Sequence, residues 1–253
     1  MGADACNQIK PIYTGYPDNK SVAESYYWSL HSAGWQSERE GNIQKAIHYF
    51  EEAYKINPDD QWADKERGAG NIEEHPEYLE TVVVPLPLKG VYKAGVNPSR
   101  GNITHAGFND FCFDFSGAAA DGEIHFPGSP DHGENADYTG FGKPVYSPVH
   151  GVVEMVTDNE PDLKPGYEYL LFTGNSITIK DEVGRPYVFI HNGQSSARVK
   201  PGERVIPGQI IAEIGNTGMS TVPNLHFGVY SQDWLMSLPV KFTVYYVVKG
   251  DGS

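Results

Sequence analysis

Two side chains in the second half of the chain have the type and the setting that a catalytic metal site requires. His226 lies in residues 223–227, where apolar and polar residues alternate as they do in a β-strand. Because side chains two positions apart lie on the same face of a strand, His226 shares its face with Asn224, while the neighbouring Leu and Phe point into the core. Asp114 is set in the same way between two phenylalanines. We therefore expect His226 and Asp114 to face outward from well-anchored strands.

An imidazole and a carboxylate held on rigid strands are suitable ligands for a hydrolytic zinc ion. Such an ion takes three protein ligands and leaves a fourth position for water. Asp110 lies on the same strand face as Asp114 and is the rival carboxylate. His125 and His132 lie in a polar, Gly- and Pro-rich stretch near residues 118–142, which we expect to be a surface insertion with solvated histidines.

The second half of the chain carries the pattern of an antiparallel sheet. From Thr81 onward, apolar residues alternate with polar ones around residues 111–115, 177–180 and 224–229. No segment there has the helical period that a parallel βαβ unit needs. The pattern predicts a mainly β domain of two antiparallel sheets over residues 81–253.

The first part of the chain predicts a small α-helical hairpin. Residues 1–19 are rich in Pro, Gly and Asp, and we expect an irregular lead-in. Apolar residues then recur at three- and four-residue steps from Ser21, a candidate N-cap, to about Ile56, with a break at residues 40–42. We expect the lead-in and hairpin to occupy residues 1–64 and a charged linker to occupy residues 65–80.

The hairpin resembles one tetratricopeptide repeat. The matching residues are Leu30, Gly34, Gly41, Ala46, Phe50, Ala53 and Pro58. A single repeat cannot bury its apolar face alone. Two interpretations stay open: a plain hairpin packed on the main domain, or a repeat that binds a protein partner.

Several motifs occur in a fixed order in the second half. They are residues 104–115 (THAGFNDFCFDF), 142–153 (GKPVYSPVHGVV), 187–191 (YVFIH), 199–209 (VKPGERVIPGQ), 215–220 (GNTGMS) and 224–227 (NLHF). Over roughly residues 81–245 this order resembles the lysostaphin-type, or LytM-type, zinc metallopeptidases, which are peptidoglycan endopeptidases. The resemblance implies a two-sheet antiparallel β-sandwich of the duplicated hybrid motif type.

The resemblance also implies which residues form the site. It places zinc ligands at His105, Asp114 and His226, and a catalytic histidine at His191 that orients water or stabilises the oxyanion. In active members of the family the residue at position 224 is a second catalytic histidine, and here it is Asn224. A carboxamide donates and accepts hydrogen bonds but cannot take up a proton. Loss of a positioned acid or base typically removes about 10²–10⁴-fold of rate.

Three functions are compatible with these motifs. The first is a zinc endopeptidase that acts on peptide bonds of bacterial cell-wall peptidoglycan, with activity impaired by Asn224. The second is a catalytically degenerate member that binds peptidoglycan or regulates another cell-wall hydrolase. The third is a biotinyl- or lipoyl-type carrier, suggested by the hairpin at residues 199–209, but Glu154-Met155 is followed by Val156 rather than by a modifiable lysine.

Composition excludes other classes of protein. The net charge is −14 and no Lys/Arg-rich run is present, so we expect no nucleic-acid partner. No apolar run reaches the roughly 18 residues of a membrane span. A cell-wall substrate predicts an extracytoplasmic protein, although the first residues show no signal peptide. Cys6 and Cys112 allow one disulfide at most, and we expect two free thiols, with Cys112 on the face of Asp114.

Overall fold

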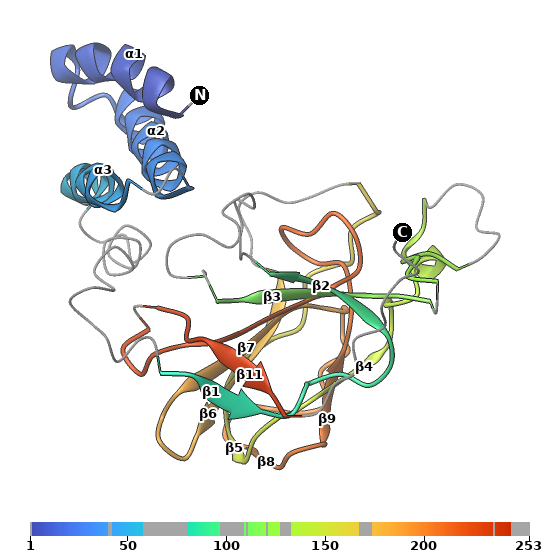
Figure 1. The fold of residues 1–253 in the computed structure, drawn as a ribbon. Coiled ribbons are helices and arrows are strands. Elements are labelled where there is room, and N and C mark those ends of the chain that lie inside the picture. Colours follow the sequence, from blue (N-terminus) through green and yellow to red (C-terminus); the bar gives the residue numbers. More distant parts are fainter. Residues whose placement is uncertain are drawn as a thin grey trace, which may run out of the picture. The chain divides into compact units, whose positions relative to one another are not determined.

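The computed structural model describes most of the chain as two compact units. The described residues are 2–39, 42–57, 80–96, 109, 111–119, 121–126, 133–166, 174–234 and 236–243. The helical unit comprises Met1–Glu80, Asn97–Asp110 and Asp233–Ser237, and the β unit comprises Thr81–Val96, Phe111–Gln232 and Leu238–Ser253 (Figure 1). Each unit is described by itself.

The described part of the helical unit contains one helix more than the sequence predicts. Its helices are α1 (Gly2–Gly15), α2 (Lys20–Arg39) and α3 (Ile43–Ile56). The two helices expected from about residues 21 and 43 are confirmed, but the expectation of an irregular lead-in is wrong. Cys6, Ile9 and Tyr13 are spaced by three and four residues, and they join the core formed by α2 and α3. This apolar stripe outweighs Pro11, which removes one hydrogen bond of α1.

The start of α2 is capped two residues earlier than expected. Asn19, not Ser21, supplies the capping side chain. Its Oδ1 accepts hydrogen bonds from the backbone N–H groups of Ser21 and Val22 at 3.1 and 3.2 Å. The resemblance to a tetratricopeptide repeat, and a protein partner for this unit, stay predictions.

Gly34 is the point of closest approach between α2 and α3. A Cβ at this position would collide with the ring of Phe50, which is fully buried. Gly34→Ala should therefore lower the stability of the helical unit by about 1–3 kcal/mol through overpacking, although alanine is the better helix former. Thermal unfolding followed by the helical circular dichroism signal measures this change.

Gly15→Ala is the matched control for this prediction. A Cβ on Gly15 would meet no heavy atom within 4 Å among the described residues. It should leave the melting temperature of the helices unchanged or raise it slightly. A Gly34→Ala protein as stable as the Gly15→Ala protein would contradict the close packing of α2 against α3.

The β unit is built on a seven-stranded sheet. Its strands, in spatial order, are β2 (Tyr92–Val96), β3 (Phe113–Gly117), β10 (Leu225–Val229), β7 (Pro186–Asn192), β6 (Asn175–Asp181), β5 (Gly151–Thr157) and β8 (Arg204–Val205). Two-stranded sheets are formed by β4 (Pro144–Tyr146) with β9 (Ile210–Glu213) and by β1 (Val82–Val84) with β11 (Val240–Phe242). Among the described strands, every pairing is antiparallel except that of β1 with β11.

The prediction of a mainly β domain with antiparallel pairing is confirmed, and the parallel pair is the exception. It is three residues long, with Val82 opposite Val240. The packing of two sheets into a sandwich of the duplicated hybrid motif type stays a prediction.

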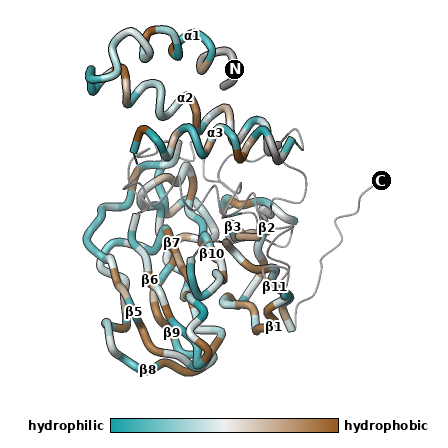
Figure 2. Tube along the Cα trace, turned by 90° about the vertical axis from the view of Figure 1, so that its left-hand side faces the viewer, coloured by the Kyte–Doolittle hydropathy of each residue, from teal (hydrophilic) through white to brown (hydrophobic). Residues whose placement is uncertain are grey.

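Apolar side chains of one face of β10 form the centre of the β unit. Leu225, Phe227 and Val229 are all buried, as the alternation in the sequence predicts. The ring of Phe227 packs against that of Phe189 on β7, with centroids 5.2 Å apart. Figure 2 shows the hydrophobic stretches concentrated on the strands of this unit. The polar side chain of His226 therefore lies on the opposite face of β10, on a rigid support.

The stretch near residues 118–142 is only partly the surface insertion that we expected. Tyr138 and Thr139 are buried, and the Thr139 hydroxyl donates to the carbonyl oxygen of Ile124 at 3.1 Å. His125 is not simply solvated, because its ring lies 4.6 Å from that of Tyr138. His132 lies outside the described residues. In this stretch Tyr138 and Thr139 pack inward because the Tyr138 ring contacts His125 and the Thr139 hydroxyl binds the Ile124 carbonyl oxygen.

Candidate metal and catalytic site

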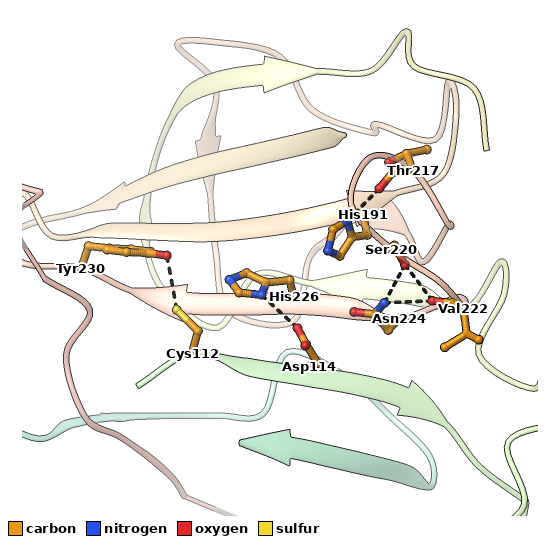
Figure 3. Close-up of polar contacts among 9 residues, drawn as sticks. All are labelled: Cys112, Asp114, His191, Thr217, Ser220, Val222, Asn224, His226 and Tyr230. Atoms are coloured by element: carbon orange, nitrogen blue, oxygen red, sulfur yellow. Dashed lines mark hydrogen bonds and ion pairs between the residues drawn. The ribbon is translucent and has the colours of Figure 1, made fainter. Parts of the chain in front are cut away.

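Asp114 and His226 are direct neighbours on adjacent strands. The register of β3 and β10 places His226 opposite Asp114, and the His226 Nδ1 lies 2.9 Å from the Asp114 Oδ1 (Figure 3). Two residues that are 112 positions apart in the sequence thus lie opposite each other in the sheet. The predicted pairing of these two side chains at one site is supported by this geometry.

The expectation that His226 faces outward is wrong in one respect. The residue is only 6% exposed, and every residue of β10 is buried, so the face of the strand that carries His226 is covered as well. The Asp114 side chain remains 29% exposed. The strand alternation identifies the face of His226 correctly but does not reveal that this face is also covered.

The spacing of His226 and Asp114 is compatible with the binding of one zinc ion by both side chains. Zinc binds imidazole nitrogen and carboxylate oxygen at about 2.0–2.2 Å, so two ligand atoms in a tetrahedral shell lie roughly 3.3 Å apart. The observed 2.9 Å between Nδ1 and Oδ1 is close to that separation. Within the part of the chain that the structure describes, no third His, Cys, Asp or Glu completes a metal cluster. His105 and the rival Asp110 lie outside the described residues.

Burial and nearby groups act in opposite directions on His226. Burial lowers the pKa of its imidazole, but the neighbouring Cys112 and Asp114 outweigh burial and raise the pKa to about 10. Because the Asp114 carboxylate only accepts, the Nδ1 atom that faces it carries a proton in the absence of a metal. A zinc ion at Nδ1 would displace that proton, so metal binding here releases protons.

Cys112 and Tyr230 lie beside His226 on the side away from Asn224. The Cys112 Sγ lies 3.3 Å from the Tyr230 hydroxyl, and both side chains are buried (Figure 3). Burial and the neighbouring Cys112 raise the pKa of Tyr230 well above its ordinary value, so the phenol stays protonated. Gly228 leaves room for this contact, since a Cβ there would meet the Cys112 sulfur at 2.5 Å. Cys112 thus occupies the face expected for it, and both cysteines are free thiols.

His191 lies near His226, at the end of β7. The two imidazole centroids are 6.1 Å apart. The His191 Nδ1 lies 2.7 Å from the carbonyl oxygen of Thr217, and a carbonyl only accepts, so Nδ1 carries a proton and donates it (Figure 3). The lone pair of the neutral ring is therefore on Nε2. The backbone of His191 has a φ of 66°, a strained value for a residue with a side chain, and such strain is common at functional sites.

The position of Thr217 depends on Gly174. This glycine has a φ of +84°, and a Cβ on it would meet the Thr217 carbonyl oxygen at 2.5 Å. Gly174→Ala should therefore displace the hydrogen-bond acceptor of His191 in addition to straining its own backbone. We expect a loss of about 2–5 kcal/mol of stability, the sum of a left-handed penalty and overpacking.

Gly184→Ala is the control that separates the left-handed backbone penalty from the overpacking expected in Gly174→Ala. Gly184 has a nearly identical φ of +86°, and a Cβ there would meet no heavy atom within 4 Å among the described residues. It should carry the left-handed penalty alone, about 1–2 kcal/mol. Urea unfolding of both variants measures the difference, and the NMR signals of the His191 ring should move only in Gly174→Ala. Equal losses would show that Gly174 does not buttress Thr217.

Asn224 is fixed by the loop that precedes it. Its Nδ2 donates to the Ser220 Oγ at 2.8 Å and to the Val222 carbonyl oxygen at 2.9 Å (Figure 3). The Ser220 hydroxyl in turn lies 2.8 Å from the Asn216 Oδ1. The structure thus brings Asp114, His191, Asn224 and His226 together, as the sequence predicts.

Sequence reasoning missed the residues that hold the site in place. Thr217 and Ser220 both lie in the Gly-rich stretch 215–220, which we assigned to the family motif without a role for its side chains. A signal was available, because Asn, Thr and Ser clustered beside a strand end are typical of loops stabilised by side-chain hydrogen bonds.

Comparison with known proteins finds a family match over part of the chain. Residues 131–237 match Peptidase family M23. The chain carries a peptidase family M23 domain. M23 peptidases are zinc metallopeptidases. The matched segment contains His191, Asn224 and His226, so the resemblance that the motifs indicated is confirmed at the level of the family.

Two curated proteins are similar to part of the chain. The L-Ala--D-Glu endopeptidase of Bacillus subtilis (strain 168) is 30% identical over 115 residues, which are 43% of this chain and 32% of that protein. The peptidoglycan DD-endopeptidase ShyA of Vibrio cholerae serotype O1 is 37% identical over 87 residues, which are 34% of this chain and 17% of that protein. The chain thus spans about a third or less of the length of these relatives.

Among solved structures, a zinc-containing peptidase from Vibrio cholerae is similar over 60% of this chain and 37% of its own. The sequence identity is 24% and the TM-score is 0.38. No helix in the described part of the chain is long and apolar enough to cross a membrane.

Proposed function

We propose that this chain is a zinc-dependent endopeptidase of low intrinsic activity that acts on peptide bonds of bacterial cell-wall peptidoglycan. One observation carries the proposal: within and beside the M23 segment, His226 and Asp114 pair across two strands with His191 close by. The names of the two curated relatives, both endopeptidases, support the choice of reaction. A peptidoglycan substrate also implies an extracytoplasmic location.

The residues divide into a metal-binding and a substrate-facing group. His226 and Asp114 would hold the zinc ion, with His105 as the third ligand. A zinc ion bound there supplies a Lewis acid that lowers the pKa of water and polarises a carbonyl group. His191 has its Nδ1–H bound to the Thr217 carbonyl oxygen, so its Nε2 can accept a proton when the ring is neutral or donate one when it is charged.

The proposed low activity follows from the residue at position 224. Peptide hydrolysis moves a proton from water to the departing amine, and two titratable groups divide this work better than one. Asn224 lies where a second such group would act, and its amide nitrogen is already occupied by Ser220 and Val222. His191 alone would therefore carry the proton transfers, and turnover should be slow.

The test is digestion of purified sacculi and of short cross-bridge peptides by the full chain. Release of new amino groups should be slow, should stop when a chelator removes the metal, and should return when zinc is added back. His226→Ala serves as the inactive control. Cleavage that a chelator does not affect would refute the proposal, and binding to sacculi without any cleavage, even at high enzyme concentration, would favour the degenerate, regulatory function instead.

A further inference from the structure

We propose that Asn224 is a substrate-binding residue, whose side-chain oxygen accepts a hydrogen bond from a backbone N–H group of the bound peptide. The inference rests on the proposed function, because it takes a peptide as the ligand. It assigns to Asn224 a role in binding, which differs from the proton transfer that a histidine performs at this position.

The orientation of the carboxamide is determined by its partners. The Val222 carbonyl oxygen can only accept a hydrogen bond, so the atom of Asn224 that lies 2.9 Å from it is the amide nitrogen. The same nitrogen lies 2.8 Å from the Ser220 Oγ. Both amide hydrogens are thus used by the loop, and the oxygen is directed away from it. In Figure 3 this oxygen points along β10 toward His226.

The Asn224 oxygen is buried, and none of the described residues forms a hydrogen bond with it. The residue is 8% exposed, and its Oδ1 has no hydrogen-bond partner among the described residues. A buried acceptor without a partner is unfavourable, and such groups in native proteins commonly have a functional explanation. A ligand that brings a donor to this oxygen would remove the cost.

The loop prevents the carboxamide from relieving that cost by rotating. The Ser220 hydroxyl contacts the Asn216 Oδ1 at 2.8 Å, and Asn216 is itself fully buried. The Asn216 Nδ2 donates to the Asn135 Oδ1 and to the Leu163 carbonyl oxygen, both at 3.0 Å. Two further segments of the β unit therefore hold the loop that fixes Asn224. An acceptor kept in place before binding loses little entropy when a ligand arrives.

The chemistry of the oxygen selects the kind of ligand group. A carboxamide oxygen is a neutral acceptor, so it binds an N–H or O–H donor, and the proton stays on the donor. A peptide offers one N–H at almost every residue in a repeating geometry. A neutral hydrogen bond of this kind stabilises substrate and transition state to a similar extent, so its loss raises KM and leaves kcat nearly unchanged.

Peptide binding to the zinc-loaded full chain tests the proposal without relying on turnover. The probes are a short synthetic cross-bridge peptide and a set of analogues in which each backbone N–H in turn is replaced by N-methyl, with dissociation constants measured by calorimetry. We expect one N-methyl analogue to bind the unaltered chain about 3–10-fold more weakly than the parent peptide. Asn224→Leu, which removes the acceptor but keeps the approximate shape, should bind the two equally.

Ser220→Ala is the matched control. It removes one partner of the Asn224 amide nitrogen but leaves the Oδ1 and the Val222 contact, so discrimination against the same analogue should persist. The zinc content and circular dichroism of each variant establish that it is folded. The N-methyl series on the unaltered chain gives a result even if Asn224→Leu fails to fold.

Three outcomes would overturn the inference. The first is equal binding of all analogues by the unaltered chain, and the second is discrimination between the analogues that survives in Asn224→Leu. The third is a fall in the kcat of Asn224→Leu without any change in its affinity for the peptide, which would mean that the Asn224 oxygen binds a water molecule. Failure of the proposed function is a separate result, because it shows as absence of zinc-dependent cleavage in both the unaltered and the Asn224→His chains.

Discussion

Asn224→His should raise the rate of peptide hydrolysis by at least about tenfold, and the upper limit set by a positioned acid or base is about 10²–10⁴-fold. The local geometry accommodates the change. The Nδ1 of a histidine occupies nearly the place of the Asn224 amide nitrogen, which donates to the Val222 carbonyl oxygen at 2.9 Å. That hydrogen bond can therefore be kept, while Nε2 adds a titratable nitrogen on the side of His191 and His226.

The comparison is made on the same sacculi and cross-bridge peptides, with the zinc content of both proteins measured in parallel. The gain should appear mainly in kcat, because proton transfer belongs to the transition state. Robust cleavage by the unaltered chain with no gain from histidine would show that Asn224 or another residue already performs the role. Absence of cleavage by either protein, with zinc bound to both, would favour a binding or regulatory function.

His226→Ala should abolish stoichiometric zinc binding and with it any zinc-dependent hydrolysis. The variant removes one of the two ligands that the structure brings together, and the two that remain in the proposed set, Asp114 and His105, hold zinc much less tightly than three. Asp114→Asn should weaken binding too, because an amide oxygen carries no negative charge to offset that of the ion. Metal analysis of protein purified without a chelator should give about one zinc per unaltered chain and close to none for His226→Ala.

Cys112→Ala is the informative comparison for the zinc prediction. Its sulfur lies beside His226 and 3.3 Å from the Tyr230 hydroxyl, so a thiolate ligand is the competing hypothesis. If His105, Asp114 and His226 form the ligand set, Cys112→Ala retains its zinc. Loss of zinc from Cys112→Ala but not from His226→Ala would overturn the assignment.

The sequence predicts strand faces well and burial poorly. Alternation around residues 113–115 and 224–229 correctly separated Asp114 and His226 from the core side chains. Exposure depends on what packs against each face of a strand, and no local pattern shows that both faces of β10 are covered. For that reason His226 was expected outside and is buried.

Long-range contacts set the remaining limits. The α1 helix was missed because Pro and Gly near its ends suggested loop, whereas its apolar stripe is stabilised by α2. The Thr217 carbonyl oxygen that orients His191 belongs to the backbone, and the position of a loop backbone cannot be derived from residue types. The order of the motifs was enough to indicate the residues of the site, but not the loop that holds them.

Anomalous diffraction at the zinc absorption edge, from crystals grown without added chelator, tests the central claim most directly. We predict one strong peak per chain, within about 2.0–2.2 Å of the His226 Nδ1 and an Asp114 carboxylate oxygen, with His105 as the third protein ligand. A peak bound by His125 and His132 instead, or a fully occupied crystal site that excludes His226, would contradict the account.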